Sequence, residues 1–197
     1  MSEINEINDN SSSSLISLNS LISLLSPLFM ISIRKASTAD IALIRTLAEV
    51  VFPATYTPLL PEGQVPFMME WMYSEESLKR QMAEGHTYYI AYADHQPCGY
   101  LSVERQGEQL FHLQKIYVLP DYQGQGVGER LFRQAVTHVR QEGSLPATIE
   151  LNVNRENRAV GFYLRIGMHR ARTVDVAIGD GYYMNDYIMA LTVANRD

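Results

Sequence analysis

The 197-residue sequence is poor in cysteine and in positive charge. Because Cys98 is the single cysteine, the sequence excludes an internal disulfide. Cys98 lies between Pro97 and Gly99, and no residue nearby in sequence would lower the pKa of its thiol. We therefore expect it to have a structural role. The net charge of −6 and the pI near 5.4 argue against a nucleic-acid or anionic-membrane partner. We therefore expect a cytoplasmic protein that binds no nucleic acid and no membrane.

The first 29 residues differ in kind from the rest. They contain no Lys or Arg, because the first is Arg34, whereas a secretory signal begins with a basic region. Their apolar runs are short, interrupted by serine and far below the ~20 residues of a membrane span. A heptad-like spacing of leucine and isoleucine would also suit a short helix or a partner contact. We expect a weakly ordered extension over residues 1–29 and one domain over residues 30–197.

Three glycines, at positions 124, 126 and 128, follow an apolar strand that ends at Pro120. They leave the N–H groups of the next helix's first turn uncovered, and these groups with the positive end of the helix dipole suit a pyrophosphate. A Gly-rich turn before a helix is also often a simple connection. The helix that follows is amphipathic, with an apolar face of Val127, Leu131, Phe132, Ala135, Val136 and Val139.

The spacing of these glycines excludes two common phosphate loops. A nucleotide triphosphatase loop would need a Lys after Gly128, and a dinucleotide loop would need Gly-x-Gly-x-x-Gly. The arrangement Gln123-x-x-Gly126-x-Gly128 instead resembles the acyl-CoA pyrophosphate loop of the GNAT superfamily of N-acetyltransferases. This resemblance implies an acetyl-CoA site that includes Gln123, Gly124, Gln125, Gly126, Val127 and Gly128.

A second segment also resembles a GNAT signature. A predicted strand over residues 147–153 precedes Asn157-x-Ala-x-x-Phe-Tyr163-x-x-x-Gly167. Asn157 can cap the short helix and Gly167 can end it in the left-handed conformation. We predict that Ala159, Phe162 and Ile166 form the packed face of this helix, and that Tyr163 points to a different side.

The resemblance implies a chemical role for Tyr163. In the family, the tyrosine at this position lies near the sulfur of CoA and protonates the departing thiolate, and the resemblance also places Asn157 in the cofactor site. The structural alternative is an amphipathic tyrosine, half-buried at the edge of the helix.

The strand predicted over residues 111–118 changes its pattern halfway. Phe111 and Leu113 are odd-numbered apolar residues, whereas Ile116 and Val118 are even-numbered. Such a change predicts a β-bulge, although a central strand can also be apolar on both faces. The GNAT resemblance implies that the backbone of Ile116, Tyr117 and Val118 binds pantetheine and the acetyl carbonyl.

The remaining pattern predicts an α/β fold. We expect a mixed, mostly antiparallel central sheet of about seven strands, flanked by about four helices, which is the GNAT fold that the resemblance implies. One helix should end at Pro53, with Val50 on its apolar face, before a long irregular connection over residues 53–67. The predicted strands cover residues 31–35, 87–93, 99–104, 111–118, 147–153, 169–177 and 183–193.

The general base is less well marked than the general acid. His112, Glu104 and Asp186 lie on strands expected to line the acceptor cleft. His112 has a suitable ordinary pKa, but a strand histidine also serves as a hydrogen-bonded wall residue. Glu104 and Asp186 would equally bind a cationic acceptor or face solvent. The histidines show no metal-ligand spacing, so we expect no metal.

The GNAT resemblance implies direct transfer of an acetyl group from acetyl-CoA to a primary amine of a small molecule or polyamine. Residues 181–189 also resemble the spermidine/spermine acetyltransferase subgroup. Two alternatives stay open: a non-catalytic acyl-CoA-binding module, and a peptide or protein N-acetyltransferase. Some families of this kind form homodimers, so the partners expected are an amine acceptor and a second copy of the chain.

Overall fold

The computed structural model describes residues 30–195. The extension predicted over residues 1–29 lies outside the described residues. Within the described range no helix is long and apolar enough to cross a membrane.

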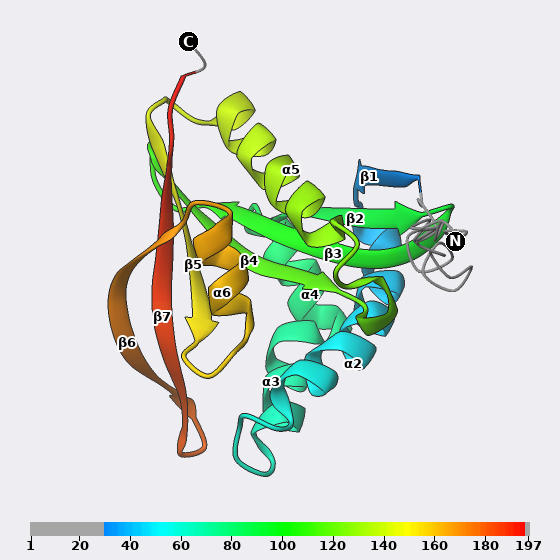
Figure 1. The fold of residues 1–197 in the computed structure, drawn as a ribbon. Helices are drawn as coiled ribbons and strands as arrows, with labels where there is room; N and C mark the ends of the chain where they lie inside the picture. The colour runs from blue at the N-terminus through cyan, green and yellow to red at the C-terminus, as the bar shows by residue number, and fades with distance from the viewer. Residues whose placement is uncertain (1–29, 196–197) are drawn as a thin grey trace, which may run out of the picture.

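A seven-stranded sheet runs through the molecule in the order β1-β2-β3-β4-β5-β7-β6 (Figure 1). Every neighbouring pair is antiparallel except β4 and β5, which are parallel, so the predicted mixed and mostly antiparallel sheet is confirmed. The strands are β1 Ile31–Lys35, β2 Thr87–Ala93, β3 Gln96–Arg105, β4 Leu110–Val118, β5 Ala147–Asn154, β6 His169–Gly179 and β7 Tyr182–Val193.

Helices cover both faces of the sheet (Figure 1). The described residues form five α-helices, one more than the sequence pattern indicated, and two short 3₁₀ helices. They are η1 Thr38–Asp40, α2 Ile41–Tyr56, α3 Gln64–Tyr73, α4 Glu75–Ala83, η2 Pro120–Tyr122, α5 Val127–Glu142 and α6 Ala159–Arg165.

The sheet separates two hydrophobic cores. Alternate side chains of β3 enter opposite cores, because successive residues of a strand point to opposite faces. Leu101 packs in the core beneath α5 and α6, whereas Tyr100 packs in the core with α2, α3 and α4. Cys98 is fully buried, and burial raises the pKa of its thiol to about 11.

The segment around Pro53 differs from the prediction. Helix α2 continues past Pro53 to Tyr56, and α3 begins at Gln64, so the expected long irregular connection is wrong. Proline removes one helical hydrogen bond. The last turn still forms, because Phe52 is buried and the Thr57 N–H donates to the Pro53 carbonyl at 3.0 Å. Val50, predicted to be buried, is 52% exposed.

The central strands diverge at one end. β4 pairs with β5 from Leu110 to His112, and no pair is recorded beyond that point, although β4 continues to Val118. Between β3 and β4 the register changes from Val103–Leu113 to Ser102–Lys115, which leaves Gln114 as the extra residue of a bulge. The bulge predicted from the apolar pattern is therefore confirmed.

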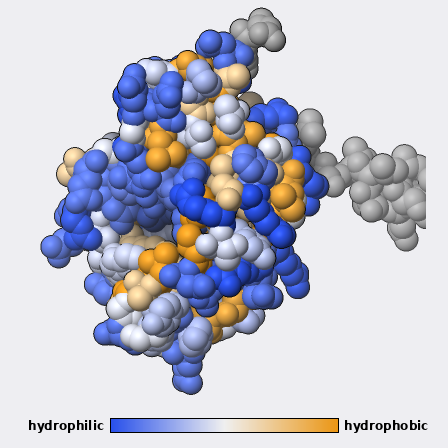
Figure 2. Space-filling model, turned by 90° about the vertical axis from the view of Figure 1, so that its left-hand side faces the viewer, coloured by the Kyte–Doolittle hydropathy of each residue, from blue (hydrophilic) through white to orange (hydrophobic). Residues whose placement is uncertain are grey.

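The outer strand β6 forms a free edge of the sheet, and most of its residues are exposed. Hydrophilic residues predominate on this side of the molecule, and hydrophobic residues form separate patches (Figure 2). The central strands β4 and β5, not this edge, line the cleft of the candidate site.

Candidate active site

A cleft of about 1670 Å³ opens where β4 and β5 diverge. Its walls come from both strands, the loop between β4 and α5, the two helices α5 and α6, and the end of α2. The sequence-predicted cofactor residues that line it are Ile116, Tyr117, Val118, Gln123, Gly124, Gly126, Gly128 and Asn157. Gln125 and Val127 are not among the lining residues, and Val127 is buried in the core.

The loop before α5 depends on glycine for its backbone conformation. Gly124 and Gly126 have φ angles of 75° and 80°, in the left-handed region that side chains disfavour. The loop is also held by its glutamines. Gln123 Nε2 donates to the Val118 carbonyl at 3.0 Å, and Gln125 Nε2 donates to the Asp121 carbonyl at 2.8 Å.

This conformation leaves a row of backbone donors without partners. The Gln123 N–H donates to the Pro120 carbonyl at 3.1 Å, and the Arg130 N–H donates to the Gly126 carbonyl at 3.1 Å. Between them, the N–H groups of residues 124–129 have no hydrogen-bond acceptor in the described structure. Unpaired N–H groups at the start of a helix bind anions, so the loop fits a pyrophosphate.

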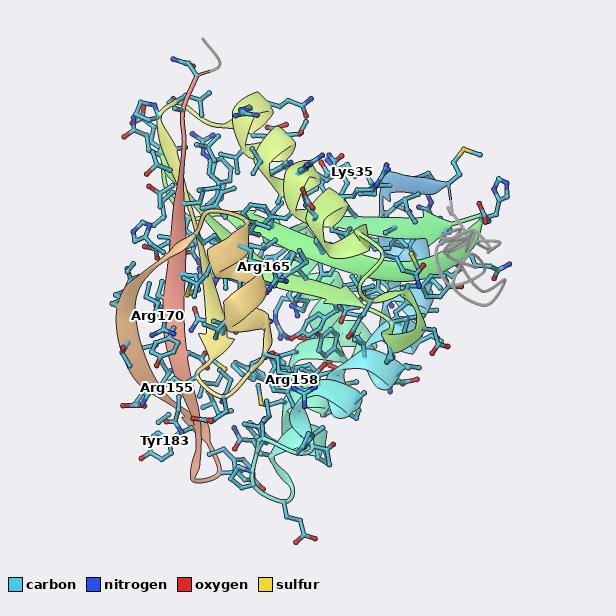
Figure 3. The ribbon with its side chains drawn as sticks, viewed as in Figure 1. Lys35, Arg155, Arg158, Arg165, Arg170 and Tyr183 are labelled. Atoms are coloured by element: carbon cyan, nitrogen blue, oxygen red, sulfur yellow. The ribbon has the colours of Figure 1, made fainter. Side chains whose placement is uncertain are left out.

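Four arginines that we did not single out in the sequence also line the cleft. Arg133 and Arg140 lie on α5, and Arg158 and Arg165 lie at the two ends of α6. Figure 3 shows the second pair beside α6, near the centre of the molecule. Arg140 Nε is buried without a hydrogen-bond partner among the described residues. These cations suit a ligand that carries several phosphate charges.

The seven-residue separation within each pair is a signal that the sequence contained. Seven residues are close to two helical turns, so both members of a pair lie on the same face of their helix. The sequence alone did not show that the faces of α5 and α6 meet across one cleft.

Tyr163 lies on α6 and lines the cleft, but it does not point away from the core as predicted. It is 6% exposed and packs in the core beneath α5 and α6 with Val160, one turn earlier. The residues predicted to form the packed face are only partly buried: Ala159, Phe162 and Ile166. Val160 and Tyr163 therefore set the rotation of this short helix.

The surroundings of Tyr163 keep its hydroxyl protonated. Burial raises its pKa well above the ordinary value, and the nearby Tyr56 adds to this effect. The helix that carries it has the predicted ends, since Asn157 Oδ1 accepts from the Ala159 N–H at 2.9 Å and Gly167 has a φ of 94°. A protonated hydroxyl on a capped helix can donate a proton into the cleft.

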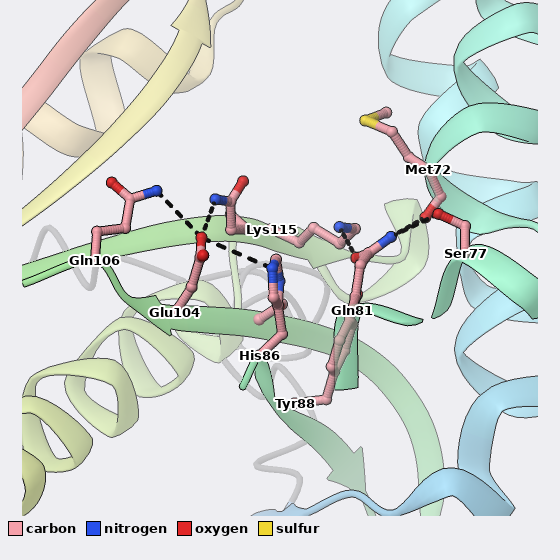
Figure 4. A network of polar contacts seen from close by, with 10 residues as sticks. Met72, Ser77, Gln81, His86, Tyr88, Glu104, Gln106 and Lys115 are labelled. Atoms are coloured by element: carbon pink, nitrogen blue, oxygen red, sulfur yellow. Dashed lines mark hydrogen bonds and ion pairs between the residues drawn. The ribbon is translucent and has the colours of Figure 1, made fainter. Parts of the chain in front are cut away.

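Glu104 and His112 are paired across β3 and β4, and neither lines the cleft. Glu104 accepts hydrogen bonds from Gln106 and Gln114 and lies 3.7 Å from His86 Nε2 (Figure 4). Burial acts to raise the pKa of Glu104, but these hydrogen bonds lower it overall. Burial lowers the pKa of His112. The structure does not bring these two residues together with Tyr163.

Lys115 follows the bulge and is 7% exposed. Its ammonium donates to Gln81 Oε1 at 2.7 Å and lies 5.4 Å from the ring centre of Tyr73 (Figure 4). Gln81 in turn donates to the Met72 carbonyl at 2.9 Å. Burial lowers the pKa of Lys115 to about 8. The bulged strand is thus connected to α4 and α3 through a cation without a carboxylate partner in the described structure.

Asp186, the third candidate base, is buried on β7 and hydrogen-bonds to Asn152. Across residues 30–195, no three His, Cys, Asp or Glu residues are grouped so that they could hold a metal ion. The donors that converge on the cleft are instead amides, arginines and a tyrosine.

Comparison with known proteins agrees with this architecture. Two solved structures have the same fold. The first is the PaiA N-acetyltransferase of Thermoplasma acidophilum in complex with coenzyme A, with a TM-score of 0.68 and 24% identity, covering 83% of this chain and 99% of that one. The second is the ribosomal-protein-S18-alanine N-acetyltransferase of Escherichia coli, with a TM-score of 0.64 and 20% identity, covering 85% of this chain and 97% of that one.

Relatives in sequence are more partial. Uncharacterized N-acetyltransferases of Mycobacterium bovis and Mycobacterium tuberculosis are 32% identical to the chain over 92 residues, or 46% of this chain. The aligned part spans 57% of their length, so the chain matches little more than half of these curated relatives. The family model described as an acetyltransferase (GNAT) domain matches residues 60–189, more than half of the chain. The chain therefore belongs to the GNAT acetyltransferase family.

Proposed function

We propose that the protein transfers the acetyl group of acetyl-CoA directly to a primary amine of a small molecule. The observation that carries this proposal is the row of unpaired N–H groups over residues 124–129, at the mouth of a cleft between diverging strands. Membership of the GNAT family supports it independently.

The cleft offers separate contacts for each part of the cosubstrate. The backbone N–H groups of residues 124–129 would hold the pyrophosphate, and the four cleft arginines would balance its charge. The backbone of residues 116–118 lines the cleft where β4 no longer pairs with β5. Its free groups would hold the pantetheine arm as an added strand and polarise the acetyl carbonyl.

Tyr163 would act as the general acid. Acetyl-CoA supplies a thioester whose thiolate leaves when the amine attacks, and a hydroxyl that stays protonated at neutral pH suits this proton transfer. Asn157 caps the helix that carries Tyr163 and lines the same cleft, so it would place both the acid and the cofactor.

Two finer questions concern the acceptor. The resemblance of residues 181–189 to the spermidine/spermine subgroup keeps polyamines among the acceptors to be tested. The ribosomal-protein-S18-alanine N-acetyltransferase of Escherichia coli has a similar fold, which keeps peptide N-termini in the same panel.

Thiol release from acetyl-CoA tests the proposal. The purified protein is incubated with acetyl-CoA and polyamines, amino acids, aminoglycosides or short peptides, and free CoA is measured. We expect amine-dependent release for at least one class. Acetyl-CoA binding by calorimetry without any turnover would indicate the non-catalytic acyl-CoA-binding module, and no binding would contradict both functions.

A further inference from the structure

Asp186 is a buried carboxylate on β7, aligned with Asn154 of β5 and Val174 of β6. It is 5% exposed. Its neighbour in the strand, Tyr187, packs towards α5 and α6, so Asp186 faces the opposite side of the sheet, where α2 lies. The carboxylate therefore approaches the diverging strands from the face opposite to the glycine loop.

The hydrogen bonding of Asp186 is incomplete. Its Oδ2 accepts from Asn152 Nδ2 at 3.1 Å, and no other hydrogen bond or ion pair to it is recorded for residues 30–195. The second oxygen is not one of the side-chain atoms sealed from solvent without a partner. One carboxylate oxygen thus remains available to a ligand.

The position of Asp186 is costly for the folded protein. Burial raises the pKa of the carboxyl, while Asn152 and the nearby Arg155 act to lower it and Asp175 acts to raise it. A buried carboxylate without a cation partner destabilises a fold unless something binds it. A buried carboxylate bonded to a residue that lines a cleft, as Asp186 is to Asn152, is a candidate for ligand recognition.

Aromatic side chains complete the surroundings. Tyr56, at the end of α2, interacts electrostatically with Asp186, and its hydroxyl lies 3.4 Å from that of Tyr117. Tyr56, Tyr117 and Asn152 all line the cleft. Aromatic rings attract cations, so a carboxylate that interacts with Tyr56 suits an ammonium group.

We propose that Asp186, held by Asn152 and flanked by Tyr56, binds the ammonium group of the acetyl acceptor, which then releases a proton to solvent before the neutral nitrogen attacks the thioester. This inference rests on the proposed transferase function and names the group that selects its substrate. Asp186 is not itself one of the residues that line the cleft, and it contacts the cleft through its hydrogen-bond partner Asn152, which is. The carboxylates that do line the cleft, Glu129 and Glu156, are exposed, and the buried charge near the bulge, Lys115, has the wrong sign.

The two substrates would then approach the strand divergence from opposite faces of the sheet. The glycine loop lies with α5 and α6, whereas Asp186 and Asn152 face α2. Tyr56 interacts electrostatically with Asp186 and also with Tyr163. An ammonium held by Asp186 would thus lie on the α2 side of the strand divergence, where Tyr163 lines the cleft from α6.

Asp186→Asn tests the assignment, with Asp180→Asn as the control. Asp180 is exposed in the β6–β7 turn with a φ of 49°, a conformation that asparagine tolerates, and its replacement removes the same charge. We expect Asp186→Asn to lower kcat/KM for the best amine of the panel about 10- to 100-fold, mainly through KM, because a charge-assisted hydrogen bond is lost. The control should change kcat/KM less than twofold. Asp186→Glu, which restores the charge, should recover part of the loss.

Two further readouts separate recognition from folding and from cofactor binding. Acetyl-CoA affinity by calorimetry should be the same in Asp186→Asn and wild type, and the melting temperature of the variant should be unchanged or higher, because a buried charge is removed. An unchanged KM in a folded Asp186→Asn would overturn this assignment alone. A wild type that binds acetyl-CoA but acetylates no amine would overturn the transferase function, and the assignment with it.

Discussion

The two sides of the cleft differ in how they would recognise a ligand. On the α5 and α6 side, the donors are backbone N–H groups, and they are free because glycines at 124 and 126 adopt left-handed conformations. On the α2 side, the candidate contacts are side chains such as Asp186 and Tyr56, which lie 130 positions apart in sequence. Backbone recognition leaves a motif in the sequence because only glycine fits the conformation. Side-chain recognition across distant elements leaves no such motif.

The largest expected effect tests the backbone side. Gly126→Asp should abolish acetyl-CoA binding, because it places a carboxylate against the pyrophosphate site and strains a residue with a φ of 80°. Isothermal calorimetry measures the affinity, and circular dichroism checks the fold. Gly126→Asn is the matched control, because asparagine tolerates this conformation and adds no charge. If the folded Gly126→Asp variant binds acetyl-CoA like wild type, the loop is a simple connection.

The next effect tests whether the two sides meet at Tyr163. Tyr163→Phe should lower kcat about 10- to 1000-fold, as expected for the loss of one general acid, and should leave acetyl-CoA affinity nearly unchanged. Steady-state kinetics with saturating amine measure the loss. Phenylalanine fills the same buried space, so the melting temperature should change little. Normal turnover in this variant would mean that the tyrosine is only a packing residue.

The fold, the bulge in β4 and the ends of α6 could be predicted from local sequence patterns. The change from Leu113 to Ile116 in the apolar pattern predicted the bulge, and Asn157 and Gly167 predicted the ends of α6. These features depend on a few neighbouring residues, and so one sequence suffices to reveal them.

The features that were missed depend on tertiary packing. Pro53 marks the end of a helix by local rules, but burial of Phe52 carries α2 through it. The rotation of α6 follows from how Val160 and Tyr163 pack, not from the motif itself. Likewise, the spacing of Arg158 and Arg165 places both on one side of a helix, but not against a cleft.

A smaller effect, on stability, is expected from replacing Lys115, which follows the bulge in β4. Lys115→Met should raise the free energy of unfolding at pH 7 by about 1–3 kcal/mol, because it replaces a buried cation by an apolar chain of similar size. Gln81 Oε1 keeps its hydrogen bond from the Tyr88 hydroxyl at 2.6 Å, so no buried acceptor is left unpaired. Urea unfolding followed by fluorescence measures the difference.

The pH dependence of that difference gives a second check. The pKa of Lys115 is about 8 in the folded protein, whereas its ordinary value, which applies to the unfolded chain, is 10.5. The unfolded chain therefore holds the proton more tightly. The cost of burying the charge is therefore full below pH 8 and disappears as the pH rises above 10.5. The advantage of Lys115→Met should shrink over this range. A variant less stable than wild type at pH 7 would show that the ammonium contributes to the fold.

The smallest effect concerns Asn157, where helix capping and cofactor binding meet in one residue. Asn157→Ala should lower the free energy of unfolding by about 1 kcal/mol, because the Ala159 N–H loses its acceptor. Asn157→Asp keeps an acceptor at the helix start, so its stability should match wild type. If Asn157 also touches the anionic cofactor, the new charge should still weaken acetyl-CoA binding several-fold. Equal affinity in the aspartate variant and wild type would limit Asn157 to capping, and recognition of the cofactor would then depend on the backbone donors and arginines alone.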